Sequence, residues 1–381
     1  MKMIRTFHPI GQGAFYSEVF ISENGENSFC VVYDCGSGML LEYPNEELIS
    51  QIKDTEFPHN TIDILFLSHF HSDHINGVKV LSAKNAIKKI VIPLVKDTDL
   101  FVCKKEDNDE MHLFCEALKD PRSLLERSNN ETKLIRVKPI SDERNSDENL
   151  EPLDINEIQD DIEIESGSIL SKSNLLWHYI PFNYEERSIK EALTENNLLD
   201  NKGNPDTNKM SEIIDVYKKF FGIKKSGREF NTNSLSVASI PSGYSFIERC
   251  CEFHHRYRRQ FCNCFYTHCI CCHPCGCMYF GDSDLEKDNY KLLNKVKAHS
   301  ENIVDCIGTV QIPHHGSKDY FDDEMFLTFR NHTIDIISFG LKNIYNHPNP
   351  ETVIRIIQTG NILIPVTQIP NSIYYECIFI K

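Results

Sequence analysis

Four potential metal ligands lie within six residues of this chain, in the run His-Phe-His-Ser-Asp-His at positions 69–74. The preceding segment Ile62–Leu67 has the apolar pattern of a buried strand, so the run follows directly on a strand end. Alternation along an extended chain places His69 and His71 on one side, where two imidazoles can bind one metal ion. Asp73 and the last histidine follow in a turn and point to a second position nearby. The run therefore predicts two metal ions, which can share a hydroxide and bind a phosphoryl or carbonyl oxygen when they lie about 3.5 to 4 Å apart. A histidine-rich surface loop is the alternative, but this order of residues after an apolar strand rarely arises that way.

The run is the signature of the metallo-β-lactamase fold, and its surroundings extend the resemblance to that family. Asp34, within Val-Val-Tyr-Asp-Cys-Gly, resembles the family's early aspartate, which orients the loop of metal ligands. Asp282, within Tyr-Phe-Gly-Asp, resembles the later aspartate that bridges both metals, and a carboxylate suits that place because its two oxygens can reach two ions. The resemblance implies an α/β fold, the αββα metallo-β-lactamase sandwich, here with an acidic insertion and a Cys-rich insertion.

Further motifs narrow the resemblance to the metallo-β-lactamase domain of ComEC-type competence proteins and their soluble relatives. These motifs occur in the order Asn231–Leu235, Phe280–Asp282, Pro313–Ser317 and Ser338–Pro348. In that branch the activity usually inferred is phosphodiester cleavage, with DNA as the substrate of the competence proteins. The competence proteins often carry an aspartate where His71 stands, and they have membrane spans that this sequence lacks. Small phosphodiesters therefore remain possible substrates, as for the phosphorylcholine esterases of the wider fold.

The resemblance implies two divalent metal ions, zinc or manganese, and seven ligands: His69, His71, Asp73, His74, Asp282, His315 and His347. His69, His71 and His315 are expected to bind one ion. Asp73, His74 and His347 are expected to bind the other ion, and Asp282 bridges the two. The nucleophile is then a bridging hydroxide whose pKa the metals lower.

His314, beside a predicted ligand, could bind or protonate the reacting phosphate, so that it and Asp73 are the candidate catalytic residues. The roles of His314 and His315 could equally be exchanged. Ser317 and Asn343 are candidate contacts to the phosphate or to the ligands, with a purely structural role in a turn as the alternative.

A second cluster consists of cysteines. Nine of the 15 cysteines lie between positions 250 and 277, where two strands that pair directly in the relatives are separated by a predicted Cys-rich insertion, residues 241–277. A short segment with little aliphatic content lacks a core of its own, and structural zinc can supply on the order of 10 kcal/mol. The candidate zinc ligands are Cys262, Cys264, Cys269, Cys272, Cys275 and Cys277. A loop of reduced, unligated cysteines and a redox sensor are the alternatives. Arginines alternate with aromatic residues over positions 253–261, a mixture that could contact a nucleic acid strand or a partner protein.

The overall composition is that of an acidic globular protein, with a formal net charge of -16. This charge argues against broad electrostatic binding to nucleic acid or to an anionic membrane. No apolar run resembles a signal peptide or approaches the roughly 18 to 20 residues of a membrane span, so a cytoplasmic location is expected. Residues 104–230 are polar, most acidic between positions 141 and 165 and largely helical over 188–221. They are expected to form an acidic, helical insertion within a single domain spanning residues 1–381.

Short apolar runs bounded by turn signals predict a mixed α/β core. The expected strands are Val19–Ile21, Phe29–Tyr33, Ile62–Leu67, Val91–Val95, Lys133–Val137, Ser234–Ile240, Met278–Gly281, Cys306–Ile312, Ile334–Phe339, Ile362–Val366 and Ser372–Ile380. The expected helices are Val78–Ile87, Glu110–Leu125 and Pro350–Thr359.

The sequence thus predicts a two-metal hydrolase, with a phosphodiesterase acting as a nuclease as the leading hypothesis. One alternative is a hydrolase of small phosphodiesters, of the cyclic nucleotide or phosphorylcholine type. Another is a catalytically silent binding module stabilised by zinc. The expected partners are DNA or another phosphodiester substrate, with no membrane, and a protein could bind at the Cys-rich insertion.

Overall fold

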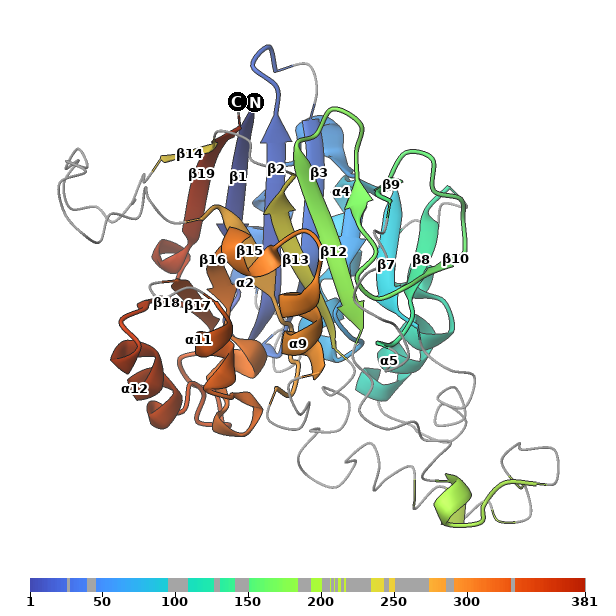
Figure 1. Cartoon of the computed structure of the whole chain (residues 1–381). Helices are drawn as coiled ribbons and strands as arrows, with labels where there is room; N and C mark the ends of the chain where they lie inside the picture. The colour runs from blue at the N-terminus through green and yellow to red at the C-terminus, as the bar shows by residue number, and fades with distance from the viewer. Residues whose placement is uncertain are drawn as a thin grey trace.

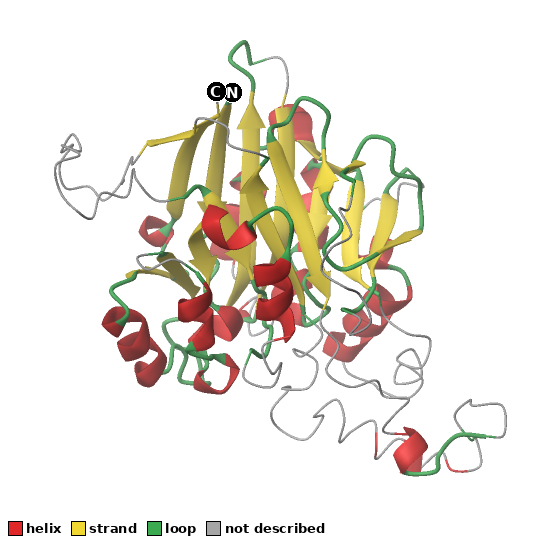
Figure 2. Cartoon of the chain, viewed as in Figure 1, coloured by secondary structure: helices red, strands yellow, loops and turns green. Residues whose placement is uncertain are grey.

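Two large β-sheets face each other in the computed structural model of the chain, and helices cover their outer faces (Figures 1 and 2). The structure describes residues 1–25, 28–39, 46–94, 109–126, 131–140, 151–183, 193–200, 234–242, 247–250, 274–285, 291–329 and 333–380, with isolated positions between 206 and 216.

The first sheet has nine strands in the order β10-β8-β7-β5-β3-β2-β1-β19-β14. Pairing of β1 with β19 brings the two ends of the chain side by side (Figure 1). In sheet order, the strands are β10 (Ile162–Ile164), β8 (Lys133–Val137), β7 (Lys89–Pro93), β5 (Ile64–Phe66), β3 (Ser28–Ser37), β2 (Gly13–Ile21), β1 (Lys2–Phe7), β19 (Tyr374–Ile380) and β14 (Ile247–Cys250).

The second sheet has eight strands in the order β18-β17-β16-β15-β13-β12-β11-β9. In sheet order, they are β18 (Ile362–Val366), β17 (Ile334–Ser338), β16 (Ile307–Gln311), β15 (Gly276–Tyr279), β13 (Leu235–Pro241), β12 (Trp177–Asn183), β11 (Leu170–Ser171) and β9 (Leu153–Asp154). A separate pair joins β4 (Thr61–Ile62) to β6 (Ala86–Ile87).

Three apolar clusters hold the layers together. One lies between the sheets and includes Phe7, Tyr16 and Trp177. A second joins the outer face of the first sheet to α2 (Glu46–Asp54), α4 (Val78–Lys84) and α5 (Asp109–Lys119). A third joins the second sheet to α9 (Lys291–Ala298), α10 (Ile303–Cys306), α11 (Glu324–Thr328) and α12 (Pro350–Gln358). Each sheet therefore buries both faces, which gives the layer order α, β, β, α of a metallo-β-lactamase fold.

Most of the predicted elements are confirmed. The strands Lys133–Val137 and Ile362–Val366 have the predicted bounds, and the helix at Pro350 ends one residue earlier than predicted. The predicted strand Ile62–Leu67 divides at Asp63 into β4 and β5. The first strand, β1, was not among the predicted elements because its buried face carries a charged residue, Arg5, which obscures the apolar alternation.

The sequence predicts residues 104–230 as an insertion, but some of these residues form strands of the two large sheets. Within them β8 and β10 extend the first sheet, and β12 pairs along its length with β13 in the second sheet. Trp177 of β12 is completely buried. Of these strands the sequence predicts β8, whereas β10 and β12 lie next to polar and acidic segments that obscure their patterns.

The predicted Cys-rich insertion, residues 241–277, lies mostly outside the described residues. Its flanking strands β13 and β15 pair directly, with Val237 opposite Tyr279, as the resemblance implies. Near its start, β14 pairs with β19 at the edge of the first sheet. Among the described residues, no helix is long and apolar enough to cross a membrane.

Candidate metal centre

The predicted site residues meet at one edge of the sandwich because they follow the carboxyl ends of parallel strands. In the first sheet β3 and β5 are parallel, and they lead to Asp34 and to the run at 69–74. In the second sheet β15, β16 and β17 are parallel, and they lead to Asp282, to the pair at 314–315 and to His347. The loops that follow such strand ends lie next to one another, which brings residues far apart in sequence together.

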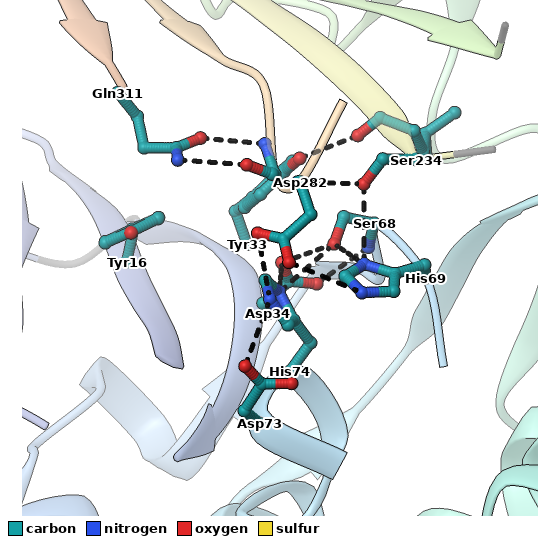
Figure 3. Close-up of polar contacts among 12 residues, drawn as sticks. Tyr16, Tyr33, Asp34, Ser68, His69, Asp73, His74, Ser234, Asp282 and Gln311 are labelled. Atoms are coloured by element: carbon teal, nitrogen blue, oxygen red, sulfur yellow. Dashed lines mark hydrogen bonds and ion pairs between the residues drawn. The ribbon is translucent and has the colours of Figure 1, made fainter. Parts of the chain in front are cut away.

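Asp282 lies at the centre of this group, with ring nitrogens near both of its carboxylate oxygens (Figure 3). His74 Nε2 lies 3.3 Å from Oδ1. On the other oxygen, Oδ2, His314 Nε2 lies at 3.6 Å and His69 Nε2 at 3.9 Å. One oxygen of this carboxylate therefore faces one imidazole and the other oxygen faces two, an arrangement that suits a bridging ligand.

Asp73 is the second carboxylate of the centre. Its Oδ2 lies 3.3 Å from His315 Nε2 and 3.9 Å from His74 Nε2. Asp73, His74, Asp282 and His315 each offer one ligand atom, and these atoms lie within 4.8 Å of one another. Four donors at this spacing fit one divalent ion.

In three of the histidines, Nδ1, the ring nitrogen that faces away from the centre, lies within hydrogen-bond distance of an oxygen atom. His74 Nδ1 lies 2.8 Å from Asp34 Oδ2, His315 Nδ1 lies 2.9 Å from the carbonyl oxygen of Ser338, and His69 Nδ1 lies 2.9 Å from Ser68 Oγ. A carboxylate or carbonyl oxygen only accepts, so in a neutral ring it fixes the proton of His74 and His315 on Nδ1. The lone pair of Nε2 then faces the centre, as in metal-binding histidines.

Two buried ring atoms test whether this centre fits metal ions. Among the described residues, His69 Nε2 and His74 Nε2 are buried polar atoms without a hydrogen-bond partner. Leaving such an atom unsatisfied costs about 1–3 kcal/mol. Both atoms point toward Asp282, and imidazole nitrogens with carboxylate oxygens form the donor set of zinc and manganese sites. The residues present therefore fit a divalent metal ion.

Burial and neighbouring charges shift the pKa values of the ligand side chains in different directions. Burial, together with the charges of His74 and His71, lowers the pKa of His69 well below its usual value. Burial lowers the pKa of His314 to about 3, so that its ring is neutral at pH 7. Burial disfavours the ionised form of Asp282, but the neighbouring charge of His74 outweighs it and holds that pKa well below the usual range. For His74, the carboxylates of Asp282, Asp73 and Asp34 outweigh burial and hold the pKa well above its usual value, and the hydrogen bond with Asp73 likewise raises the pKa of His315. A metal ion would displace the protons of these two rings, because it binds neutral imidazoles and ionised carboxylates.

Asp34 supports the centre from inside the first sheet. It is completely buried, and its Oδ1 accepts a hydrogen bond from the Ser68 backbone amide at 2.7 Å while Oδ2 accepts one from the Ser68 hydroxyl at 2.6 Å. The same carboxylate contacts His74. Asp34 thus positions both Ser68, which directly precedes the histidine run, and the ring of His74 within that run.

Gln311 and Ser234 hold the turn that carries Asp282, and Gln311 belongs to none of the predicted motifs. Gln311 Oε1 accepts hydrogen bonds from the backbone amides of Phe280 and Gly281 at 2.8 and 2.7 Å, and Ser234 Oγ accepts one from the Asp282 amide at 3.0 Å. Gly281 has a φ of +58°, and a Cβ there would lie 2.7 Å from Ser234 Oγ. Ser234 belongs to a motif quoted above, but its contact with the turn depends on the pairing of β13 with β15.

His314 and His315 have φ values of 45° and 55° in the turn Pro313–Gly316. Non-glycine residues seldom adopt this left-handed conformation, although histidine, asparagine and aspartate adopt it more readily than most. The turn sends the two rings to different sides, His314 toward Asp282 Oδ2 and His315 toward Asp73. His315 therefore lies with Asp73 and His74, not with its expected partners His69 and His71, and it is His314 that faces the same Asp282 oxygen as His69.

The remaining predicted residues lie at the rim of the centre. The His71 ring lies 4.7 Å from that of His69. The His347 ring lies 5.2 Å from that of His314, and its Nδ1 is 3.4 Å from Gln12 Nε2, so this predicted ligand is one ring away from the carboxylates. Ser317 is buried and its backbone amide donates to the His314 carbonyl at 3.0 Å.

Asn343 uses its side chain within its own loop. Its Nδ2 donates to the carbonyl oxygens of Gly340 and His347, each at 2.6 Å. Its Oδ1 accepts from the backbone amides of Tyr345 and His347, at 3.1 and 2.9 Å. The structural role in a turn, one of the two alternatives for this residue, therefore accounts for all four contacts.

Of the six candidate zinc ligands, only Cys275 and Cys277 are described. Both are buried in the cluster between the sheets, and burial raises the pKa of the Cys277 thiol, which favours its neutral form. The other four, Cys262, Cys264, Cys269 and Cys272, lie outside the described residues, so a structural zinc site stays a prediction.

Comparison with known proteins agrees with this geometry. Residues 19–98 match the family model described as the Metallo-beta-lactamase superfamily. The matched segment runs from the end of β2 past β7 and includes Asp34 and the histidine run. The chain has no match among curated proteins. The match, the α/β sandwich and the cluster of His and Asp ligands together indicate a metallo-beta-lactamase superfamily domain with the centre of a metal-dependent hydrolase.

Proposed function

We propose that this protein is a two-metal phosphodiesterase whose substrates are nucleic acids. The observation that carries the proposal is the position of Asp282, whose Oδ1 faces the ring nitrogen of His74 and whose Oδ2 faces those of His314 and His69. A site for a single ion needs no such division of ligands. Two adjacent ions are the common solution for phosphodiester cleavage, because they can contact both the attacking and the leaving oxygen.

The ligand groups follow from the distances. His69, His71 and His314 would hold one ion with Asp282 Oδ2. Asp73, His74 and His315 would hold the other with Asp282 Oδ1. When bound, the two ions would supply an activated water and neutralise charge on the phosphoryl group.

The surrounding residues have defined tasks in this proposal. Asp34 keeps the Nδ1 proton of His74 in place, so that Nε2 remains available as a ligand. The ring of His347 is neutral at pH 7, since burial, with the charge of His315, lowers its pKa to about 4. It lies beside His314 at the rim, where it could hydrogen-bond a phosphate oxygen. The resemblance to the ComEC-type motif series supports phosphodiesters over β-lactams as substrates.

A substrate panel with added Mn²⁺ or Zn²⁺ tests the proposal. The panel comprises single-stranded DNA, double-stranded DNA, RNA, cyclic dinucleotides, bis-p-nitrophenyl phosphate and a chromogenic β-lactam. We expect metal-dependent cleavage of bis-p-nitrophenyl phosphate and of at least one polynucleotide. Cleavage of the small esters alone would favour a small-molecule phosphodiesterase. Hydrolysis of the β-lactam alone would contradict phosphodiester specificity altogether.

Metal analysis of the purified protein tests the alternative of a catalytically silent binding module. We expect Asp73→Ala and Asp282→Ala to lose bound metal together with activity. If both variants kept the full metal content of the parent protein, the metal would be held elsewhere, and a module stabilised by zinc at the cysteines would be the better description.

A further inference from the structure

The loop between β17 and α12 presents apolar side chains to solvent beside the metal centre. Leu341, Ile344 and Tyr345 are 51%, 78% and 63% exposed. Lys342, also exposed, lies between them in sequence, and no ion pair joins it to a carboxylate in the described part of the chain. Large apolar groups gathered on one loop at the rim of a site often mark a binding surface.

These side chains are held outward by an ordered loop. Asn343 makes four hydrogen bonds to the loop backbone. The backbone amide of Leu341 donates to Gln368 Oε1 at 3.1 Å, and that of Gly340 donates to Gln12 Oε1 at 3.2 Å. Several polar contacts therefore order a loop whose large apolar residues remain more than half exposed.

A row of rings links this loop to the predicted metal ligands. The Tyr345 and His347 rings are stacked, with centroids 5.8 Å apart and planes 30° apart. The His347 ring lies 5.2 Å from that of His314, whose Nε2 is 3.6 Å from Asp282. A substrate with its phosphate at Asp282 and a planar group along this row would reach Tyr345.

We propose that the loop Leu341–Tyr345 is the platform for a nucleobase next to the scissile phosphate, with Tyr345 as the stacking residue. The inference rests on the proposed function and names the group of the substrate that this site recognises. Stacking of a base on an aromatic side chain requires only an exposed ring face and tolerates different bases. Lys342 adds a positive charge that suits the neighbouring phosphate of a strand and repels a quaternary ammonium group. The loop therefore favours a nucleotide over a phosphorylcholine ester.

The test compares two esters that share a leaving group. The parent protein and Tyr345→Ala are assayed with Mn²⁺ on thymidine 5′-(p-nitrophenyl phosphate) and on methyl p-nitrophenyl phosphate. We expect the ratio of kcat/KM for the nucleoside ester to that for the methyl ester to fall about 5- to 150-fold in Tyr345→Ala, the equivalent of one stacked base. Tyr345→Phe should restore the ratio, because the ring face is kept. Leu327→Ala is the matched control: Leu327 is 76% exposed on α11 and lies outside the loop.

An unchanged ratio in Tyr345→Ala, or a loss seen only with p-nitrophenylphosphorylcholine, would overturn the nucleobase platform. If the parent protein cleaves neither ester, the proposed function fails independently, and binding of a fluorescent oligothymidylate then decides the inference. Weaker binding by Tyr345→Ala than by Leu327→Ala would support the platform, and equal affinities would overturn it.

Discussion

Two clusters of buried charged side chains lie in this sandwich, and they are built differently. The metal centre occupies the edge where the parallel strands end. The Arg5 cluster, defined as Arg5, Glu18 and Glu376, lies between the two sheets. Arg5 Nε is 2.7 Å from Glu18 Oε1, and Arg5 Nη1 is 2.6 Å from Glu376 Oε2. Both clusters bring carboxylates out of water, which is costly unless partners compensate the charge.

The Arg5 cluster supplies those partners from the protein itself. Glu18 accepts hydrogen bonds from the hydroxyls of Tyr179, Tyr279 and Ser239, and Glu376 accepts one from Thr309 at 2.6 Å. Several of these donors come from the second sheet, so the cluster ties the sheets together. Among the described residues, Arg5 Nη2 is its one buried atom without a partner.

The metal centre lacks such compensation. Asp73 and Asp282 face histidine rings, and the buried Nε2 atoms of His69 and His74 have no hydrogen-bond partner. A buried cluster closed by its own hydrogen bonds serves stability, whereas one that leaves donor atoms aimed at a common point is built for a ligand. The comparison therefore predicts that substitutions in the two clusters will affect different properties.

The largest effect is expected at Asp282. Asp282→Asn should lower metal-dependent hydrolysis of bis-p-nitrophenyl phosphate by at least about 1,000-fold, because the loss of ions that stabilise transition-state charge costs several kcal/mol. Bound metal, measured by mass spectrometry, should fall in parallel. Glu376→Gln is the matched control in the closed cluster and should keep its metal content. Unchanged turnover in Asp282→Asn would refute a bridging role.

The second-largest effect is expected at Arg5, and it concerns the free energy of unfolding. Arg5→Met should reduce the free energy of unfolding by about 3–5 kcal/mol, because it leaves Glu18 and Glu376 buried without a counter-charge. Urea denaturation followed by circular dichroism measures this loss. Lys79→Ala, which breaks a solvent-exposed pair with Glu126, should change stability by less than about 1 kcal/mol. If Arg5→Met lost no more stability than this control, the Arg5 cluster would not stabilise the fold. The contrast between the two clusters would then be wrong.

The sequence predicts the metal centre but not the Arg5 cluster, and the reason is physical. The histidine run and the aspartate of Tyr-Phe-Gly-Asp are short contiguous patterns at strand ends, so their residue types alone indicate a metal centre. The Arg5 cluster joins residues from opposite ends of the chain, and its members occur singly in strands of mixed composition. Only the pairing of β1 with both β2 and β19 brings them together.

Within the centre itself, the sequence indicates which residues gather but not which side each ring takes. The separation of His314 from His315 depends on two consecutive left-handed residues, a backbone choice that no side-chain pattern encodes. The supporting contacts of Ser68 and Gln311 likewise depend on strand register. Tyr345 gave no signal because a single exposed aromatic residue is common in any loop.

An intermediate effect is expected at Asp34, which acts through a ligand. In Asp34→Asn, an amide oxygen that still accepts from the Ser68 backbone would turn its NH₂ group toward His74 Nδ1. The ring would then carry its proton on Nε2, the wrong tautomer for metal binding. We expect the metal affinity to fall about 10- to 100-fold. Titration with Zn²⁺ against a competing chelator measures this.

Asp63→Asn is the control for that experiment. Asp63 is also buried, directly before β5, but its oxygens contact the Cys30 amide at 2.9 Å and Lys88 Nζ at 2.8 Å, and neither partner is a histidine. Its metal affinity should match that of the parent protein. Equal affinities in Asp34→Asn and the parent would show that the tautomer of His74 is not set by Asp34.

The smallest effect is expected at Asp335, a buried carboxyl group with neither a metal centre nor a cation beside it. It accepts hydrogen bonds from Thr333 Oγ1 at 2.7 Å and Asn361 Nδ2 at 2.9 Å, yet burial raises its pKa from 3.8 to about 7. The folded state therefore keeps this proton between pH 4 and 7 while the unfolded state releases it. The resulting stability is complete below pH 4 and is lost as the pH rises through 7. Between pH 6 and 8 the parent should lose on the order of 1 kcal/mol relative to Asp335→Asn, which carries no titrating group. Parallel urea denaturation curves at the two pH values measure this difference. Identical pH dependence in the two proteins would mean that Asp335 is ionised in the folded state. The protein would then bury carboxylates only in the two ways compared above, and not also as a neutral acid.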